Sequence, residues 1–435
     1  MSNSEDDTMI PPATKKVKLN NSDELILDML SELPDCVILH ILSFLNTKDA
    51  VQTCILSVRW KDLWKHLPAL IFHKSNFRTH KIFTKFVSTV LSLRDSSLAL
   101  HTLDFNQGNS RLEPRVLKRI VNYAISHNVQ HLGLSVTSSI AQIPLTLFSS
   151  HTLTHLNLFI STHDDIAQMS LNLPSLTYLK LSVYSGHENV FPKSLILPAL
   201  TSLQLGNFAF CVGDNGCAEP FSIFDRLNSL LICGCTVKDT TTLCISSATL
   251  VTFTMYSHSY DNFYKIDLCT PSLSTFAFCG TPYQEIRGSN ISSLKHVDIH
   301  SDALSNDRWP PFFLLSWLIE FTNIISLTIT ATSLQVLNLI PRLFKYNFPS
   351  LGKLKSLNVE IDEIQYGFRM TLCDVKLLSV KSKKKAARIR KAFSLGSEPS
   401  PAVPDGITDF LLQNSPSAEV VFIDCTKKPL RPRYL

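Results

Sequence analysis

The chain has 435 residues, 45% of them hydrophobic and 18% charged, and its formal net charge is +5. These values are typical of a well-buried globular protein, and the length allows two or three domains or one long repeat array. The eleven cysteines are scattered, and there is neither a signal-peptide pattern nor an uncharged apolar run of about 18 residues. We therefore expect a soluble intracellular protein with free thiols and no membrane span.

Basic residues gather in three short runs, Lys15–Lys18, Lys381–Lys391 and Lys427–Arg433. Runs of this kind serve more often as targeting signals or solvated flanks than as a nucleic-acid surface. In addition, no aromatic residues interleave with Lys381–Lys391 to stack on bases. The sequence therefore argues against a nucleic-acid partner.

Residues 1–29 are polar and acidic, and we expect them to be disordered. They include a short stretch in which proline favours an extended chain and closely spaced lysines give the charges that an importin groove reads. This stretch resembles a monopartite nuclear-import signal formed by Lys15, Lys16 and Lys18. The alternative is a solubilising basic patch. The expected location is the nucleus, the cytoplasm or both.

A helix with an excess of apolar surface is predicted next. It begins at Leu33-Pro34, because proline suits the first helical turn. A surface helix needs one apolar stripe, whereas here apolar residues cover most of the circumference. Two short helices follow, one capped by Thr47 and one by Ser57. The excess surface predicts a second chain or domain packed against this helix. The residues concerned are Leu33, Val37, Ile41, Phe44 and Leu45 on one side, extended by Cys36, Ile38, Leu39 and Leu42.

Five short motifs occur here in order: Leu33-Pro34-Asp35, Ile41–Leu45, Thr47–Val51, Leu56–Trp60 and Leu63-Trp64. In order and spacing they resemble the plant F-box family. The resemblance implies a docking module, over residues 30–70, for the Skp-type adaptor that joins the cullin of an SCF complex. The residues expected at the adaptor interface or directly beneath it are Leu33, Pro34, Ile38, Ile41, Leu42, Leu45, Trp60 and Trp64.

From Leu100 onward the chain repeats the pattern Leu-x-x-Leu-x-Leu. It occurs 11 times up to Val359, with successive starts 21–30 residues apart, close to the period of leucine-rich repeats. The last two apolar residues of each repeat point inward from a short strand. One repeat cannot bury this row, but stacked repeats form a parallel sheet over a continuous core.

The predicted fold class is α/β, with an N-terminal three-helix F-box followed by a leucine-rich-repeat solenoid shaped like a horseshoe. We expect the solenoid over residues 76–348. Residues 349–425 then hold the last repeat and a helix and strand within Ile407–Ile423. This part resembles the FBD region found at the C-terminus of many plant F-box proteins. Residues 426–435 form a basic tail.

On each repeat strand, the side chains that lie between and beside the two inward-pointing apolar residues project onto the concave side of the predicted horseshoe. Hydrogen-bonding and aromatic groups outnumber fixed charges there, and aromatic residues are enriched at binding hot spots. The alternative is that these are ordinary solvated positions and that loops at the rim recognise the target. The residues predicted to bind a target are His155, Asn157, Tyr178, Lys180, Gln204, Tyr256, His296, Asp298, His300, Asn358 and Glu360.

No motif predicts catalysis or a bound metal ion. The pairs His127/His131 and His151/His155 have the spacing of metal ligands, but no carboxylate accompanies them, and His131 and His155 fall on predicted strands. The sequence contains neither a glycine-rich loop motif that would bind phosphate nor a motif that places a catalytic nucleophile. We expect no metal, no cofactor and no catalytic residue. The stretch Trp309–Phe313 is either a partner site or, the interpretation that we favour, packing.

The resemblance implies a non-catalytic substrate-recognition subunit of an SCF-type cullin–RING ubiquitin ligase. In this interpretation the F-box docks the adaptor and the repeats hold a target protein. A first rival is a leucine-rich-repeat scaffold or binding protein that works independently of any ligase. A second rival is an enzyme carried on the solenoid, for which no catalytic constellation is present.

Overall fold

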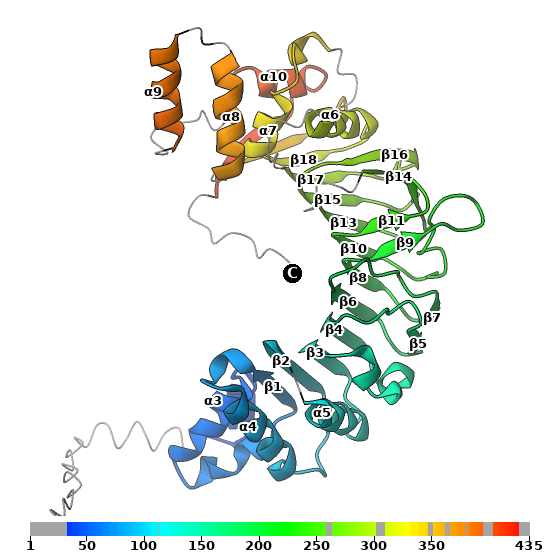
Figure 1. The fold of residues 1–435 in the computed structure, drawn as a ribbon, viewed down its shortest axis with the longest axis vertical. Coiled ribbons are helices and arrows are strands. Elements are labelled where there is room, and N and C mark those ends of the chain that lie inside the picture. The colour runs from blue at the N-terminus through cyan, green and yellow to red at the C-terminus, as the bar shows by residue number, and fades with distance from the viewer. Residues whose placement is uncertain are drawn as a thin grey trace, which may run out of the picture.

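The computed structural model describes residues 33–425 apart from 112, 258–262, 302–308, 347–350, 362–365, 379, 381 and 395–402. These residues form an arc (Figure 1). Short helices make one end of the arc, a wide sheet lines its inner side, and a group of helices makes the other end. Within the described ranges, no helix is long and apolar enough to cross a lipid bilayer.

The first end of the arc consists of α2 (Asp35–Ser43), α3 (Thr47–Gln52) and the 3-10 turns η1 (Thr53–Ile55), η2 (Arg59–Lys61) and η3 (Leu63–His66). Helix α2 begins one residue after Pro34, close to its predicted start. Helix α3 is capped by Asn46, whose side chain accepts the Asp49 N–H at 3.1 Å. The predicted cap, Thr47, instead accepts the N–H of Ile71 at 2.7 Å and is buried.

The prediction of one helix after Ser57 is wrong. The segment forms the two separate turns η2 and η3, which meet at Asp62, where φ is −115°. Its apolar residues are buried nonetheless, with Trp60 supplied by η2 and Leu63 and Trp64 by η3. The sequence thus predicted correctly which residues are buried, but it predicted one α-helix where two 3-10 turns form.

A parallel sheet of 13 strands forms the inner side of the arc. Each neighbour in the sheet is the next of these strands along the chain, and every pairing is parallel. The strands are β1 (Ala69–His73), β2 (Thr102–Arg111), β3 (His131–Thr137), β4 (His155–Ser161), β6 (Tyr178–Tyr184), β8 (Ser202–Gly206), β10 (Ser229–Cys233), β13 (Thr252–Ser257), β15 (Thr275–Gly280), β17 (His296–Ser301), β18 (Ser326–Thr330), β19 (Ser356–Ile361) and β20 (Glu419–Asp424).

Two apolar rows run through this sheet and form the core beneath it. Leu103 and Phe105 of β2 pair in register with Leu132 and Leu134 of β3, and the same register continues from strand to strand. All 11 pairs predicted from the sequence lie in these two rows, and each of their side chains is at most 2% exposed. Burying one such side chain contributes about 1.5–3 kcal/mol. The predicted strands and their inward faces are confirmed.

Strand β1 was not predicted. It continues both rows with Leu70 and Phe72, which are buried, and it pairs with β2. The chain then forms η4 (Lys74–Asn76) and α4 (His80–Leu93) before β2. The N-terminal helices therefore join the sheet through one of its own strands, without an intervening linker.

Short elements cover the outer side of the arc (Figure 1). They are α5 (Pro114–Ser126), η5 (Ile140–Gln142), η6 (Leu145–Ser149) and three small parallel sheets, namely β5 (Ser170–Asn172) with β7 (Ser194–Ile196), β9 (Ala209–Cys211) with β11 (Thr236–Lys238), and β12 (Thr242–Ser246) with β14 (Tyr264–Cys269) and β16 (Gln284–Asn290).

The far end of the arc contains α6 (Trp309–Glu320), α7 (Ala331–Leu337), η7 (Leu343–Lys345), α8 (Tyr366–Leu378), α9 (Lys383–Ser394) and α10 (Ile407–Leu412). The helix and strand predicted within Ile407–Ile423 are present as α10 and β20. The stretch Trp309–Phe313 opens α6, where Pro310 and Pro311 are buried and Trp309 is 65% exposed. The prolines of this stretch are thus packed inside the protein, whereas Trp309 stacks on Phe313 of the same helix with ring centroids 6.3 Å apart and stays largely exposed.

Candidate functional surfaces

Helix α2 carries two neighbouring apolar stripes. Ile38 and Leu42 are fully buried in the core, and Leu45 packs against it. The other stripe is Val37, Ile41 and Phe44, which are 39%, 39% and 75% exposed. Both stripes follow helical i, i+4, i+7 spacing, one residue apart, so they lie about 100° apart around the helix. One side of α2 is covered by the chain, and the next side is left on the surface.

A second exposed apolar segment lies close to α2. Ile55, Leu56 and Val58 are 84%, 53% and 91% exposed. The following residue, Arg59, forms an ion pair with Asp35 in the first turn of α2 at 2.5 Å. This ion pair holds the segment beside the start of the helix. We call Val37, Ile41, Phe44, Ile55, Leu56 and Val58 together the apolar patch.

The structure divides the predicted adaptor-binding residues into two groups. Pro34 and Ile41 are exposed, and Leu33 and Leu45 are half-buried. The other four, Ile38, Leu42, Trp60 and Trp64, are buried in the core and can only support the surface above them. The prediction omitted five members of the apolar patch. The recurrence of Val37 and Phe44 at helical spacing from Ile41 was the signal that could have identified two of them.

The predicted target-binding residues all lie on the sheet face opposite the core rows. Register places Tyr178 beside His155, and Lys180 beside Asn157. His155, Asn157 and His296 are exposed and Glu360 is buried, while the remaining members are half-buried. The predicted members of this concave face are polar or aromatic, in contrast to the apolar patch, and apolar side chains such as Leu231 and Val421 lie beside them on the same face.

Three rings form a ladder across the concave face. The ring centroids of His131 and His155 are 4.2 Å apart, and those of His155 and Tyr178 are 5.6 Å apart with nearly parallel planes. Partial burial, together with the charge of His131, lowers the pKa of His155 below its ordinary value. The neutral imidazole is therefore favoured, and this suits stacking against an aromatic group.

Among the described residues, no group of three His, Cys, Asp or Glu side chains has an arrangement that could hold a metal ion. Helix α5 ends at Ser126, so helical spacing does not relate His127 to His131. The His127 ring stacks on Tyr123 at 3.9 Å, and its Nδ1 lies 2.8 Å from the Tyr123 carbonyl oxygen.

A group of ionisable side chains lies toward the other end of the concave face. The Nε2 of His300 is 2.7 Å from Asp298 Oδ1 and 3.8 Å from Glu360 Oε2. The strands β17 and β19 that carry these residues are separated by β18. The cluster brings two carboxylates to this half of the face, whereas Lys180 lies in the half nearer the N-terminal helices. The two halves therefore differ in charge.

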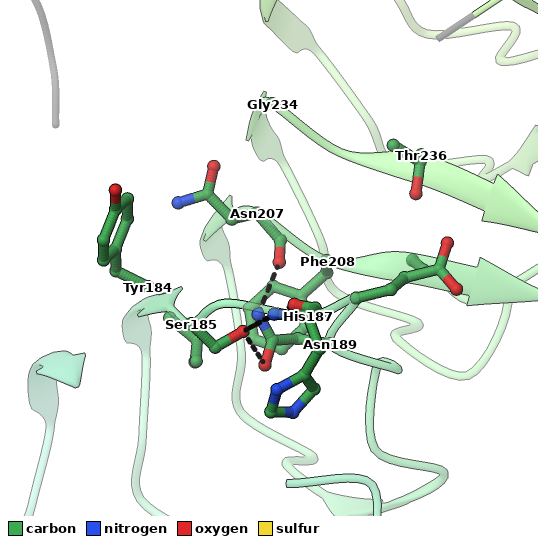
Figure 2. Close-up of a pocket in the computed structure, with 11 residues that line it drawn as sticks. Tyr184, Ser185, His187, Asn189, Asn207, Phe208, Gly234 and Thr236 are labelled. Carbon is green, nitrogen blue, oxygen red and sulfur yellow. Dashed lines mark hydrogen bonds between the residues drawn. The ribbon is translucent and has the colours of Figure 1, made fainter. Parts of the chain in front are cut away.

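A pocket of about 360 Å³ opens at the rim, where β6 and β8 end (Figure 2). Its floor is held by Asn189, which is buried: its Oδ1 accepts from Ser185 Oγ at 3.1 Å, and its Nδ2 donates to the Asn207 carbonyl at 3.4 Å. Asn207 has φ +61°, a conformation that asparagine tolerates. Figure 2 shows its amide between Tyr184 and Gly234. The pocket offers polar groups to a rim ligand, as the alternative interpretation of the repeats requires.

Burial makes the nearby thiols poor nucleophiles. It raises the pKa of Cys235 to about 12 and also raises the pKa of Cys233. A thiol that stays protonated does not attack, because the thiolate is the reactive form. A packing role at the end of β10 and the turn after it is thus sufficient to explain why both positions hold cysteine. The lysines predicted to act in nuclear import, Lys15, Lys16 and Lys18, lie outside the described residues.

Comparisons with known proteins identify the N-terminal part of the chain. The F-box domain family matches residues 30–72. The chain is 30% identical over 174 residues to F-box/LRR-repeat protein 13 of Arabidopsis thaliana, which covers 39% of this chain and 38% of that protein. A putative FBD-associated F-box protein of the same plant is 31% identical over 160 residues, 35% of this chain and 34% of that protein.

A third Arabidopsis thaliana relative is an F-box/FBD/LRR-repeat protein, 29% identical over 184 residues, 39% of each chain. The chain thus matches less than two fifths of the length of each of these three relatives. The predicted resemblance to plant F-box/leucine-rich-repeat proteins of the FBD type is confirmed.

Proposed function

We propose that this chain, which carries an F-box domain and resembles plant F-box/leucine-rich-repeat proteins, is the substrate-recognition subunit of an SCF-type cullin–RING ubiquitin ligase. F-box domains generally bind Skp-type adaptors. The observation that carries the proposal is the apolar patch, because six exposed apolar side chains lie within the matched domain, three on α2 and three on the segment that the Arg59–Asp35 ion pair ties to its first turn. Large exposed apolar patches of soluble proteins mark interaction sites.

We further propose that the 13-stranded parallel sheet is a leucine-rich-repeat solenoid and that its concave face holds the target. The eleven phased repeats and the strand order along the chain support this assignment. Residues 349–425, with β19, α10 and β20, would then close the array as an FBD region, a name that two of the three relatives share. The chain itself supplies no nucleophile in this scheme, and ubiquitin transfer is accelerated by proximity within the assembled ligase.

The test is co-purification of adaptor and cullin with the tagged full chain and with the variant Ile41→Asp, Phe44→Asp. We expect the unaltered chain to bring down both proteins and the variant to lose both, because a carboxylate in an apolar interface is strongly disfavoured. The matched control is Ile196→Asp, Ile223→Asp, which alters two residues of similar exposure on the outer side of the arc. If the unaltered chain brings down neither protein, it is a scaffold that works independently of a ligase.

We also propose that Lys15, Lys16 and Lys18 direct the protein to the nucleus. The competing basic run is less suited to this role because Lys383–Lys391 is wound into α9, whereas an importin groove reads an extended segment. Replacing the three N-terminal lysines with alanine should move a tagged protein to the cytoplasm. An unchanged distribution in fluorescence microscopy would contradict this assignment.

A further inference from the structure

Helix α9 concentrates the excess positive charge of the protein. It contains six basic residues and no acidic residue. The whole chain has 41 basic and 36 acidic residues, so outside α9 the acidic residues outnumber the basic ones by one. All six cations are exposed: Lys383, Lys384, Lys385, Arg388, Arg390 and Lys391. The net charge thus belongs to one helix rather than to the molecule as a whole.

The apolar side of α9 is used inside the protein. Ile389 and Phe393 are buried against Cys373 of α8, and the Lys376 ammonium lies 5.5 Å from the centre of the Phe393 ring. Helix α8 is in turn held in the main core by Phe368, which is fully buried. The docking of α9 fixes which side faces out, and that side is basic.

Five of the six exposed cations, all except Lys385, form two rows along α9. Lys384, Arg388 and Lys391 follow i, i+4, i+7 spacing and make one row, and Lys383 and Arg390 make the other. A strip of small side chains, including exposed Ala387, separates the rows. With side chains, a helix is about 10–12 Å across, and the major groove of B-DNA is about 12 Å wide. The rows are therefore placed to meet the two phosphate chains that border a groove.

We propose that α9 binds double-stranded nucleic acid by lying in the major groove, with one cation row on each phosphate chain. Contacts of this kind position a protein on a duplex without reading its sequence. The sequence argued against a nucleic-acid partner because no aromatic residues accompany the cations. Aromatic side chains stack on the unpaired bases of single strands, however, so their absence does not argue against binding of a duplex.

Two features of α9 disfavour other anionic partners. A helix that binds a lipid surface needs an exposed apolar face, whereas the apolar face of α9 is packed on α8. A single acidic helix of a partner protein would neutralise only one of the two rows. A duplex presents phosphates on both sides and can neutralise both.

The test is the affinity of the full chain for a short DNA duplex of arbitrary sequence, measured by fluorescence anisotropy over a salt series. The variant Lys384→Gln, Arg388→Gln, Lys391→Gln removes one row and preserves helix propensity. The matched control is Arg115→Gln, Lys118→Gln, Arg119→Gln, which removes three exposed cations from α5. Circular dichroism and adaptor binding should be unchanged in both variants, which separates this proposal from the ligase proposal.

We expect the α9 variant to bind at least tenfold more weakly than the parent. Its slope of log K against log salt should be less steep by about 2.7, because each phosphate contact contributes about 0.9. The α5 control should bind like the parent. Equal duplex binding by the α9 variant would overturn the proposal. So would equally tight, α9-dependent binding of single-stranded DNA, of polyglutamate or of vesicles containing phosphatidylserine, which would assign the helix to a different partner.

Discussion

The apolar patch and the concave face are both exposed, yet the chain builds them in opposite ways. The patch comes from one helix and one adjoining segment, and all six of its members are apolar. The concave face takes one or two polar side chains from each of many strands, and its members include His155, Lys180 and Asp298.

The two surfaces are suited to two different kinds of binding. Apolar burial is non-directional and strong for its area, so a compact patch suffices for one constant partner. Polar groups discriminate because an unmatched buried donor or acceptor costs about 1–3 kcal/mol. A wide polar face is therefore suited to selecting a target, and its individual residues should each contribute less.

The largest expected effect is on adaptor affinity. Replacing Val37, Ile41 and Phe44 with alanine should weaken adaptor binding roughly a thousandfold, because three apolar side chains would each lose about 1.5 kcal/mol of burial. Isothermal titration calorimetry measures this change. The control Leu145→Ala, Ile196→Ala, Ile223→Ala removes exposed apolar groups elsewhere and should not alter affinity. A loss of less than tenfold in the first variant would move the adaptor interface away from the patch.

The next effect concerns the stability of the sheet, which lies apart from the apolar patch. Gly280 has φ +120°, and a Cβ there would collide with the Ser257 carbonyl. Gly280→Ala should lower the free energy of unfolding by about 3 kcal/mol, from strain and steric overlap. Gly108→Ala, where φ is also positive but no atom lies nearby, should cost only about 1 kcal/mol. Denaturant titration distinguishes the two variants, and equal costs would contradict the close approach at Gly280.

A smaller effect is expected on the concave face. Tyr178→Ala with Lys180→Glu, and separately His296→Ala with Asp298→Lys, should each weaken target binding up to about tenfold. The readout is the half-life in cells of proteins that accumulate when this chain is deleted, with adaptor binding unchanged. His187→Ala with Asn207→Gly tests the rim pocket instead and keeps a residue that accepts φ +61°. Stabilisation by the rim variant alone would assign recognition to the loops.

The smallest effect concerns pH. The folded-state pKa of His155 lies below its ordinary value of 6.5, so below that pH the unfolded chain binds more protons than the folded chain. Stability from this group is therefore present above pH 6.5 and is lost as the pH falls toward the folded-state pKa. His131→Ala should raise the pKa of His155, because it removes one cause of the depression. A titration of the His155 ring by NMR measures the shift, and an unchanged midpoint would exclude coupling across the ladder.

The repeated strands could be predicted because their signal is local. Side chains alternate across a strand, so Leu132 and Leu134 must face the same side wherever the strand packs. The F-box end was harder, because Ile38 and Ile41 are the same residue type on the same helix and differ only in what covers them. The third helix was also mispredicted, since the spacing of Trp60, Leu63 and Trp64 fits two short 3-10 turns as well as one helix.

The positions of the 11 repeat strands, the two core rows and the F-box motifs could be predicted from the sequence, because each depends on residues close together in the chain. Which stripe of α2 stays exposed depends instead on contacts between segments distant in the chain. Ile38 and Leu42 are buried in the same core as Trp60, Leu63 and Trp64, whereas Val37, Ile41 and Phe44 point to the side that no part of the described chain fully covers. The same holds for α9, whose outward cation rows are set by the packing of Ile389 and Phe393 on α8. Burial is a property of contacts between distant segments, and a local pattern does not encode which contact forms.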